Sequence, residues 1–173
     1  MSVIDSIRYL FDAAQAGDNK KLMQLLGANP DLANAENSDG LTPLGFASHF
    51  GHRDVVQILL DHGANVNAVS HSKISYIPSN TALHAALAGE RNIEVITLLL
   101  NHGGQTDLLD SNGHTCLHVA AYHQDNTEII RLLLENGAPV NAKVEGGKTA
   151  LTIAIEQGND QVANLLREHG AKE

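Results

Sequence analysis

The stretch from Asp110 to Asn141, DSNGHTCLHVAAYHQDNTEIIRLLLENGAPVN, contains every signal of a small two-helix unit. Its first four residues, 110–113, predict a turn, because glycine adopts positive φ without steric cost and Asx side chains bond their own backbone. Thr115 stands where a helix N-cap belongs, directly before an apolar run. A second apolar run ends at Gly137, which is typical of a helix C-terminus, and Pro139 follows it. We therefore expect two short helices joined by a polar turn.

The same unit recurs along the chain. One threonine before an apolar helix start marks each copy, and successive marker threonines are 39, 34 and 34 residues apart. A Leu-Leu pair followed by a Gly closes each copy, at residues 59–63, 99–103, 133–137 and 165–170. The four threonines are Thr42, Thr81, Thr115 and Thr149.

The pattern resembles the ankyrin repeat, a unit of about 33 residues made of a β-turn and two helices, with the signature T-P-L-H-x-A. Residues 38–68 match it most fully, through Thr42-Pro43-Leu44 and the closing run 55–67. The resemblance covers nearly the whole chain. It implies an all-α fold, an ankyrin-repeat solenoid of stacked helix-turn-helix units with β-hairpin-like fingers, and a non-enzymatic role in protein-protein interaction.

The repeat spacing predicts one domain, residues 1–173, built of five repeats. The first lacks the T-P-L-H start but keeps the two-helix pattern, and polar residues in the first and last repeats suit the capping ends of a stack. The boundaries are about 3–36 for the N-terminal cap repeat, 37–69 for repeat 2, 70–109 for repeat 3, 110–143 for repeat 4 and 144–173 for the C-terminal cap repeat.

Departures from the period single out three segments, because natural repeat arrays place insertions on loops. Relative to a unit of about 33 residues, repeat 3 carries about six extra residues within 69–80, which predicts an extended finger. Repeats 3 and 4 each have one extra residue between their helices, at 89–92 and 124–126.

Composition restricts the partners. The net charge of −9 argues against nucleic-acid binding and allows a basic protein partner, although surplus carboxylates also serve solubility alone. The single Cys116 permits no internal disulfide, and no apolar run has the length of a membrane span. We expect a monomeric cytoplasmic protein that binds neither membranes nor cofactors.

The chain contains ten histidines and one cysteine, but their spacing favours neither a metal site nor a catalytic site. The pairs His114/His118 and His49/His52 have short spacings, but neither is joined by further ligands at suitable positions. Cys116 lies at a helix start, which would favour the thiolate, and a catalytic dyad with His118 is conceivable, yet a spacing of two residues points their side chains apart on a helix. We prefer a buried structural role for Cys116.

The ankyrin resemblance assigns structural roles to several polar residues. It implies that His84 and His118 hydrogen-bond neighbouring loop backbone, a role in doubt where Gly45 and Thr152 replace them. It also implies that Asn67 and Asn141 are sites of hydroxylation in an animal cell. Independently, His62, His102 and His169 precede helix-ending glycines, where a cation suits the helix C-terminus.

The resemblance further implies that partners contact the fingertips and the exposed end of each first helix on a concave groove. Of the six aromatic residues, Phe50, Tyr76 and Tyr122 fall there, where they either anchor a partner or pack against neighbouring repeats. The partner-binding residues that we predict are Asp39, Leu41, His49, Phe50, Tyr76, Ile77, Asn112, His114, Tyr122, His123, Glu145, Lys148 and Gln157.

The predicted function is a partner-binding module, and its small size suggests a stand-alone inhibitor or neutralising protein. The same fold could instead serve as a structural spacer within a larger assembly, because one fold supports unrelated functions. A metal or thiol site built on Cys116 and the histidines is a third interpretation, from a different functional class.

Overall fold

The computed structural model describes all 173 residues and contains ten α-helices, one 3₁₀ helix and no β-strand. The chain forms two compact units, which are described separately: unit 1, residues 1–104, and unit 2, residues 105–173. The predicted all-α class is thereby confirmed. Unit 1 contains α1 (Val3–Ala16), α2 (Asn19–Ala28), η1 (Pro30–Asn34), α3 (Pro43–His49), α4 (Arg53–Asp61), α5 (Ala82–Ala88) and α6 (Ile93–Asn101), and unit 2 contains α7 (Cys116–His123), α8 (Thr127–Glu135), α9 (Ala150–Gln157) and α10 (Asp160–Glu168).

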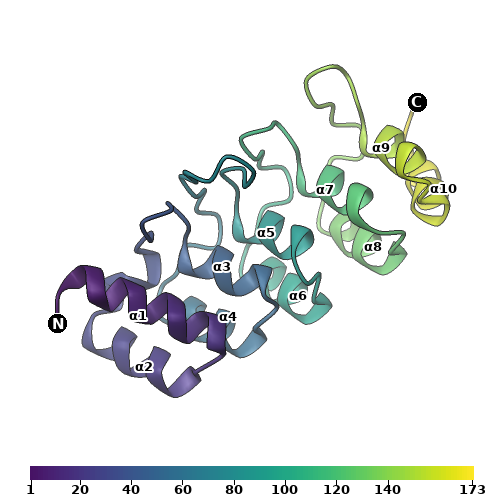
Figure 1. The fold of residues 1–173 in the computed structure, drawn as a ribbon. Helices are drawn as coiled ribbons and strands as arrows, with labels where there is room; N and C mark the ends of the chain where they lie inside the picture. Colours follow the sequence, from purple (N-terminus) through teal and green to yellow (C-terminus); the bar gives the residue numbers. More distant parts are fainter. The chain divides into compact units, whose positions relative to one another are not determined.

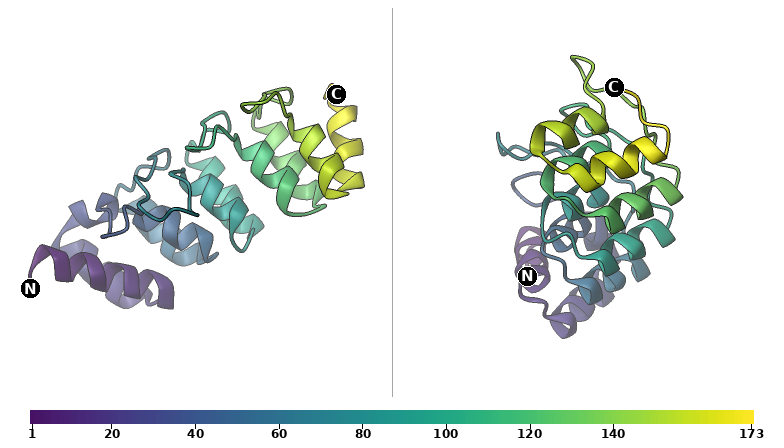
Figure 2. Two further views of the ribbon diagram at one scale, coloured as in Figure 1. Left: turned by 45° about the horizontal axis from the view of Figure 1, so that its top comes forward. Right: turned by 90° about the vertical axis from the view of Figure 1, so that its right-hand side faces the viewer.

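Within each unit the helices form two layers. In unit 1, α1, α3 and α5 pack side by side in one layer, and α2, α4 and α6 form the other (Figure 1). In unit 2, α7 packs on α9 and α8 on α10 (Figure 2). Long loops project from the ends of the helix pairs as fingers. Burial of small and medium apolar side chains between the layers, such as Leu22 and Leu59 in unit 1 and Leu117 and Ile130 in unit 2, drives this packing.

The marker threonines begin the first helix of their repeats, which confirms their predicted role as N-caps. Each side-chain oxygen accepts a hydrogen bond from the backbone N–H three residues later, at distances of 3.1–3.4 Å. These bonds satisfy donors that would otherwise lack a partner at a helix start. The helices of this layer are only seven or eight residues long after α1, so a satisfied first turn is a large part of their stability.

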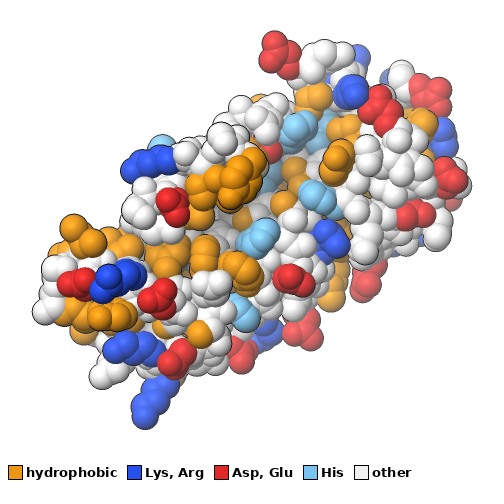
Figure 3. Space-filling model, in the orientation of Figure 1, with side chains coloured by type: hydrophobic (Ala, Val, Ile, Leu, Met, Phe, Trp, Pro, Cys, Tyr) orange, Lys and Arg blue, Asp and Glu red, His pale blue; other side chains and the backbone are white.

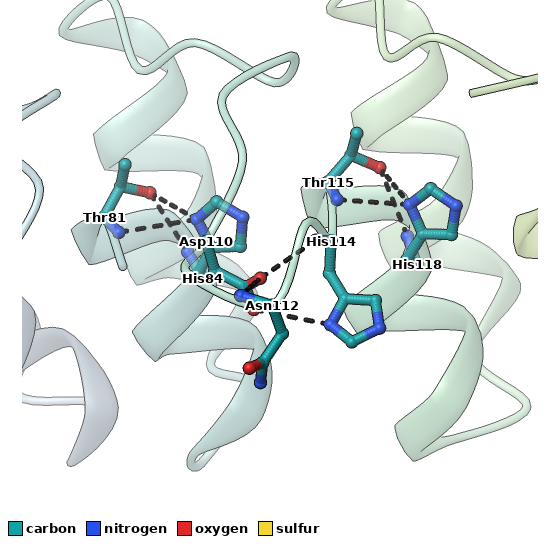
Figure 4. Close-up of polar contacts among 7 residues, drawn as sticks. All are labelled: Thr81, His84, Asp110, Asn112, His114, Thr115 and His118. Atoms are coloured by element: carbon teal, nitrogen blue, oxygen red, sulfur yellow. Dashed lines mark hydrogen bonds and ion pairs between the residues drawn. The ribbon is translucent and has the colours of Figure 1, made fainter. Parts of the chain in front are cut away.

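Two repeats complete the cap with a histidine. In the close-up of Figure 4, Nδ1 of His118 accepts hydrogen bonds from the backbone N–H of Thr115 at 3.1 Å and from its hydroxyl at 2.8 Å. His84 and Thr81 form the same reciprocal arrangement in unit 1. Because Nδ1 accepts both bonds, each imidazole must be neutral there. In the last repeat Thr152 replaces the histidine, and its hydroxyl lies 3.2 Å from the hydroxyl of Thr149.

Asparagine side chains join successive repeats at the finger side. Asn34 donates to the carbonyl of Gly63 at 2.9 Å, Asn67 donates to Gly103 at 3.0 Å, and Asn141 donates to Gly170 at 3.0 Å. The equivalent position in repeat 3 is Asp107, which has no amide N–H to donate. Asn67 and Asn141 therefore have a structural role, and their hydroxylation stays a prediction.

Histidines also close the second helices. The ring Nδ1 atoms of His62, His102 and His169 lie 2.8–2.9 Å from the backbone carbonyl four residues earlier. A neutral imidazole can donate this bond, so the arrangement satisfies a terminal carbonyl without requiring the cation that the position suggested.

A second set of contacts crosses between repeats at the opposite helix ends. The ring Nε2 of His52 lies 2.8 Å from the carbonyl of Gln15, and Asn159 donates to the carbonyl of Ala121 at 2.9 Å. Asn159 therefore makes no side-chain cap for its own helix, α10. Asp125 of the preceding repeat supplies that cap, accepting from the N–H of Gln161 at 3.3 Å and of Val162 at 2.8 Å. The lengthened turn 124–126 thus caps the next repeat in space.

The outer surface of the first repeat is less polar than its sequence suggested. Val3 and Ile4 on α1 are 64% and 80% exposed, and Met23 on α2 is 49% exposed. Scattered apolar side chains are ordinary on a protein surface.

The division of the chain into five repeats of a single domain remains a prediction.

Replacing Asp125 by Ala should lower the free energy of unfolding by about 1 kcal/mol, the usual cost of removing a helix N-cap. Asp125→Asn should retain most of the stability, because an amide oxygen still accepts hydrogen bonds. Chemical denaturation followed by circular dichroism measures both variants. Gln124→Ala, in the same exposed turn, is the matched control, and equal losses in the Gln124 and Asp125 variants would contradict the assigned cap.

Candidate functional site

An aromatic cluster runs across the first-helix layer of unit 1. Phe11 of α1 packs edge-on against Phe46 of α3 with ring centroids 5.1 Å apart, and Phe46 packs against Phe50 at 5.0 Å. His49 contacts Phe50 edge-on at 5.2 Å, and His52 stacks on it at 6.3 Å. Phe46 and Phe50 are half-buried, so the cluster is partly structural and partly presented to solvent. Residue spacing alone did not single out Phe46, although it precedes Phe50 by one helical turn.

The extended finger, residues 69–80, is held against the preceding finger by backbone hydrogen bonds. The N–H of His71 donates to the carbonyl of Gly40, and the N–H of Lys73 donates to that of Asp39, both at 2.9 Å. Gly40 has φ of 77°, and a Cβ atom there would collide with the His71 carbonyl, so only glycine fits. The finger is therefore pinned along its first half.

The finger presents Tyr76 at its tip. A turn closes with the N–H of Ile77 donating to the carbonyl of Ile74 at 3.1 Å, and Tyr76 within that turn is 84% exposed. The side chain is thus not used to pin the finger. Among the other residues predicted in unit 1, Asp39 and His49 are exposed and Leu41, Phe50 and Ile77 are partly exposed.

The predicted residues of unit 2 belong to α7, α9 and their fingers. Tyr122 is 55% exposed and its ring lies edge-on to His123, with centroids 5.2 Å apart. Lys148 forms an ion pair with Glu156 at 2.8 Å, so this cation is engaged within the unit. The exposed residues of the set are Asn112, Tyr122, His123, Glu145, Lys148 and Gln157, and His114 is partly exposed.

The loop before α7 is ordered by the buried carboxylate of Asp110. It accepts hydrogen bonds from the N–H of Asn112 and of His114, both at 2.9 Å, and lies 3.6 Å from the His114 ring. Figure 4 shows these three residues around the turn. The predicted binding residues Asn112 and His114 are therefore held in a defined conformation.

The geometry does not assemble a metal or thiol site. No group of three or more His, Cys, Asp or Glu side chains is placed to hold a metal ion. His114 lies in the loop and His118 in the helix, where its Nδ1 is already bonded to Thr115. Cys116 is completely buried, and this burial strongly raises the pKa of its thiol. A buried thiol with a raised pKa is a poor nucleophile.

Comparison with known families agrees with the repeat geometry. A family model described as ankyrin repeats (3 copies) matches residues 10–108 and 83–173. These matches together cover most of the chain. The chain belongs to the ankyrin-repeat family.

Similar proteins are found in several organisms. The chain is 41% identical over 91 residues, 53% of its length, to the serine/threonine-protein kinase VIK of Arabidopsis thaliana, and covers 19% of that protein. It is 39% identical over 75 residues, 43% of its length, to the putative ankyrin repeat protein FPV031 of fowlpox virus, covering 20% of it. It is 31% identical over 105 residues, 61% of its length, to the ankyrin repeat and SAM domain-containing protein 6 of Mus musculus, covering 11% of it.

The chain thus spans a fifth or less of the length of these relatives. Ankyrin repeats are protein-protein interaction modules, and the family is generally non-enzymatic. None of the helices in this ankyrin-repeat chain is both long and apolar enough to cross a membrane.

The capping histidine of repeat 4 makes stability depend on pH. Burial, the largest cause, lowers the pKa of His118 below its ordinary value, and nearby His114 adds to this. The unfolded chain therefore takes up a proton near pH 6.5 while the folded chain resists it, so His118 stabilises the fold fully above about pH 6.5 and less as pH falls through the folded pKa.

We expect the free energy of unfolding to fall as the pH is lowered below about 6.5, with a smaller fall in His118→Gln. Denaturant titrations at a series of pH values measure both proteins. His169→Gln, at an exposed helix end, controls for a general histidine effect. Identical pH profiles for the wild type and His118→Gln would contradict the role of His118.

Proposed function

We propose that this ankyrin-repeat chain binds a partner protein through the first-helix faces and fingers of its two units, without catalytic activity of its own. The observation that carries the proposal is Tyr76, a large aromatic side chain 84% exposed on a finger that backbone hydrogen bonds hold in place. An exposed aromatic on a preorganised loop is the usual form of an interface anchor, because little conformational freedom is lost on binding.

Further support comes from the neighbouring surface of unit 1. The predicted set in unit 1 also contains half-buried Phe50 and partly exposed Leu41 and Ile77, which add apolar area to the surface of this unit. In unit 2, Tyr122 and His123 form a second exposed aromatic pair. Each unit is proposed to contribute its own patch to the interface.

The partner that we propose is basic. The chain has a net charge of −9, and Asp39 and Glu145 lie exposed on the fingers. Exposed carboxylates of this kind steer a basic partner and contribute to specificity more than to affinity. As a mode of action we propose that a monomer of this chain masks the bound surface and so inhibits or neutralises its partner. A cytoplasmic location is part of the same proposal.

The alternative of a structural spacer predicts that the aromatic side chains are dispensable. The alternative of a thiol or metal site predicts that alkylation or a chelator abolishes binding. Neither has a specific structural observation in its favour, since Cys116 is buried and no ligand group is assembled.

Replacing Phe50, Tyr76 or Tyr122 by Ala should each weaken capture of the partner, with Tyr76→Ala losing about tenfold in affinity or more. The measurement is affinity purification with the full chain as bait, followed by titration of the recovered partner. Met23→Ala, an exposed apolar residue on the second-helix layer, is the matched control. Unchanged recovery of every partner by all three aromatic variants would refute the proposed surface.

A further inference from the structure

Two exposed acidic residues, Asp12 and Glu90, belong to the elements that flank the aromatic cluster of unit 1. On one side is α1, which packs against α3: its Phe11 touches Phe46, and the next residue, Asp12, is exposed. On the other side is Glu90 in the turn between α5 and α6. Figure 3 shows acidic side chains on both sides of the hydrophobic row over α3.

The approach of Glu90 to the rings is fixed by backbone contacts. Its N–H donates to the carbonyl of His49 at 2.9 Å. A Cβ atom added to Gly51, the residue after Phe50, would lie 3.2 Å from the Glu90 Cβ. At Gly89 a side chain would collide with the His49 carbonyl, so this glycine permits the close approach of the two turns. The Glu90 side chain therefore extends from a point directly beside the C-terminal end of α3.

Neither carboxylate is neutralised within the chain. Asp12 and Glu90 form no ion pair, whereas Arg8, the cation one turn before Asp12, is held by Asp5 at 3.0 Å. The other cations of this region are Arg91, whose Nε is buried, and Arg53, which lies 3.4 Å from Asp54 and 3.9 Å from Glu94. The surface thus combines partly exposed aromatic rings with two carboxylates that have no ion-pair partner within the chain.

We propose that this surface binds a cationic side chain of the partner, arginine in preference to lysine, seated against Phe46 and Phe50 and flanked by Asp12 and Glu90. The inference rests on the proposed function, because it names a group that the partner presents. A cation is attracted by the ring quadrupole, and the effect strengthens where water is displaced. Guanidinium suits the site better than ammonium, because it is planar, weakly hydrated and able to stack while its N–H groups reach carboxylates at its edges.

The test uses a defined probe and needs no knowledge of the partner. The full chain, labelled with ¹⁵N and ¹³C, is titrated with N-acetyl-arginine-N-methylamide and followed by nuclear magnetic resonance. We expect saturable shifts centred on His49, Phe50 and Glu90, with a dissociation constant in the millimolar range that single side chains reach. N-acetyl-citrulline-N-methylamide has nearly the same shape without the charge and should produce no saturable shifts, and the lysine analogue should bind more weakly than arginine.

Variants assign the binding to the named groups. Asp12→Asn and Glu90→Gln should each weaken the arginine probe about two- to fivefold, the effect of losing one exposed ion pair. Phe50→Leu keeps an apolar side chain but loses the ring, and should weaken binding by a similar factor. Arg91→Gln removes a like charge and should strengthen binding. Thermal unfolding of each variant confirms that its fold is intact.

Equal responses to arginine and citrulline, or affinities unaffected by Asp12→Asn and Glu90→Gln, would overturn the proposed arginine site. Such a result would leave the proposed protein-binding function standing, because that function is tested separately by Tyr76 and Tyr122 in partner capture. Conversely, failure of the proposed protein-binding function would appear as unchanged partner capture by the aromatic variants, and the titration with the arginine probe does not test it.

Discussion

Helices of seven to ten residues are too short to persist alone in water, and nine of the ten α-helices in this chain are no longer than that. Each therefore depends on a satisfied first turn and on a packed neighbour. The marker threonines supply the first condition in four repeats. Bonds from Asn34, Asn67 and Asn141 to the next repeat contribute to the second. Within each unit, stability is thus a property of neighbouring repeats together.

This dependence separates framework from function. The threonine caps, buried leucines and asparagine bonds recur from repeat to repeat and so identify the fold without identifying a partner. Individuality lies where the repeats differ. The finger 69–80 exposes Tyr76. In repeat 2, Phe46 and Phe50 occupy positions that hold the small residues Ala85 and Gly89 in repeat 3. Glu90 lies in a lengthened turn.

The sequence was sufficient for the helices, their threonine caps and the long finger, because those signals are local and repeat in register. It was insufficient for contacts between residues about one repeat apart. Nothing in the local pattern shows that Asp125 caps α10 or that His52 bonds the carbonyl of Gln15. Phe46 was missed as a surface residue because its apolar character alone indicates a core position. The helix η1 was missed for a similar reason, since Pro30 suggests a loop after α2.

The central claim is that partners engage the first-helix faces and fingers while the second helices serve as support. Hydrogen exchange of the full chain, measured by mass spectrometry with and without the captured partner, tests this claim most directly. We predict that the partner slows exchange in the finger 69–80 and in the segment 42–51, with little change in α4, α6, α8 and α10. Protection confined to those second helices, with the fingers and α3 unchanged, would contradict the account.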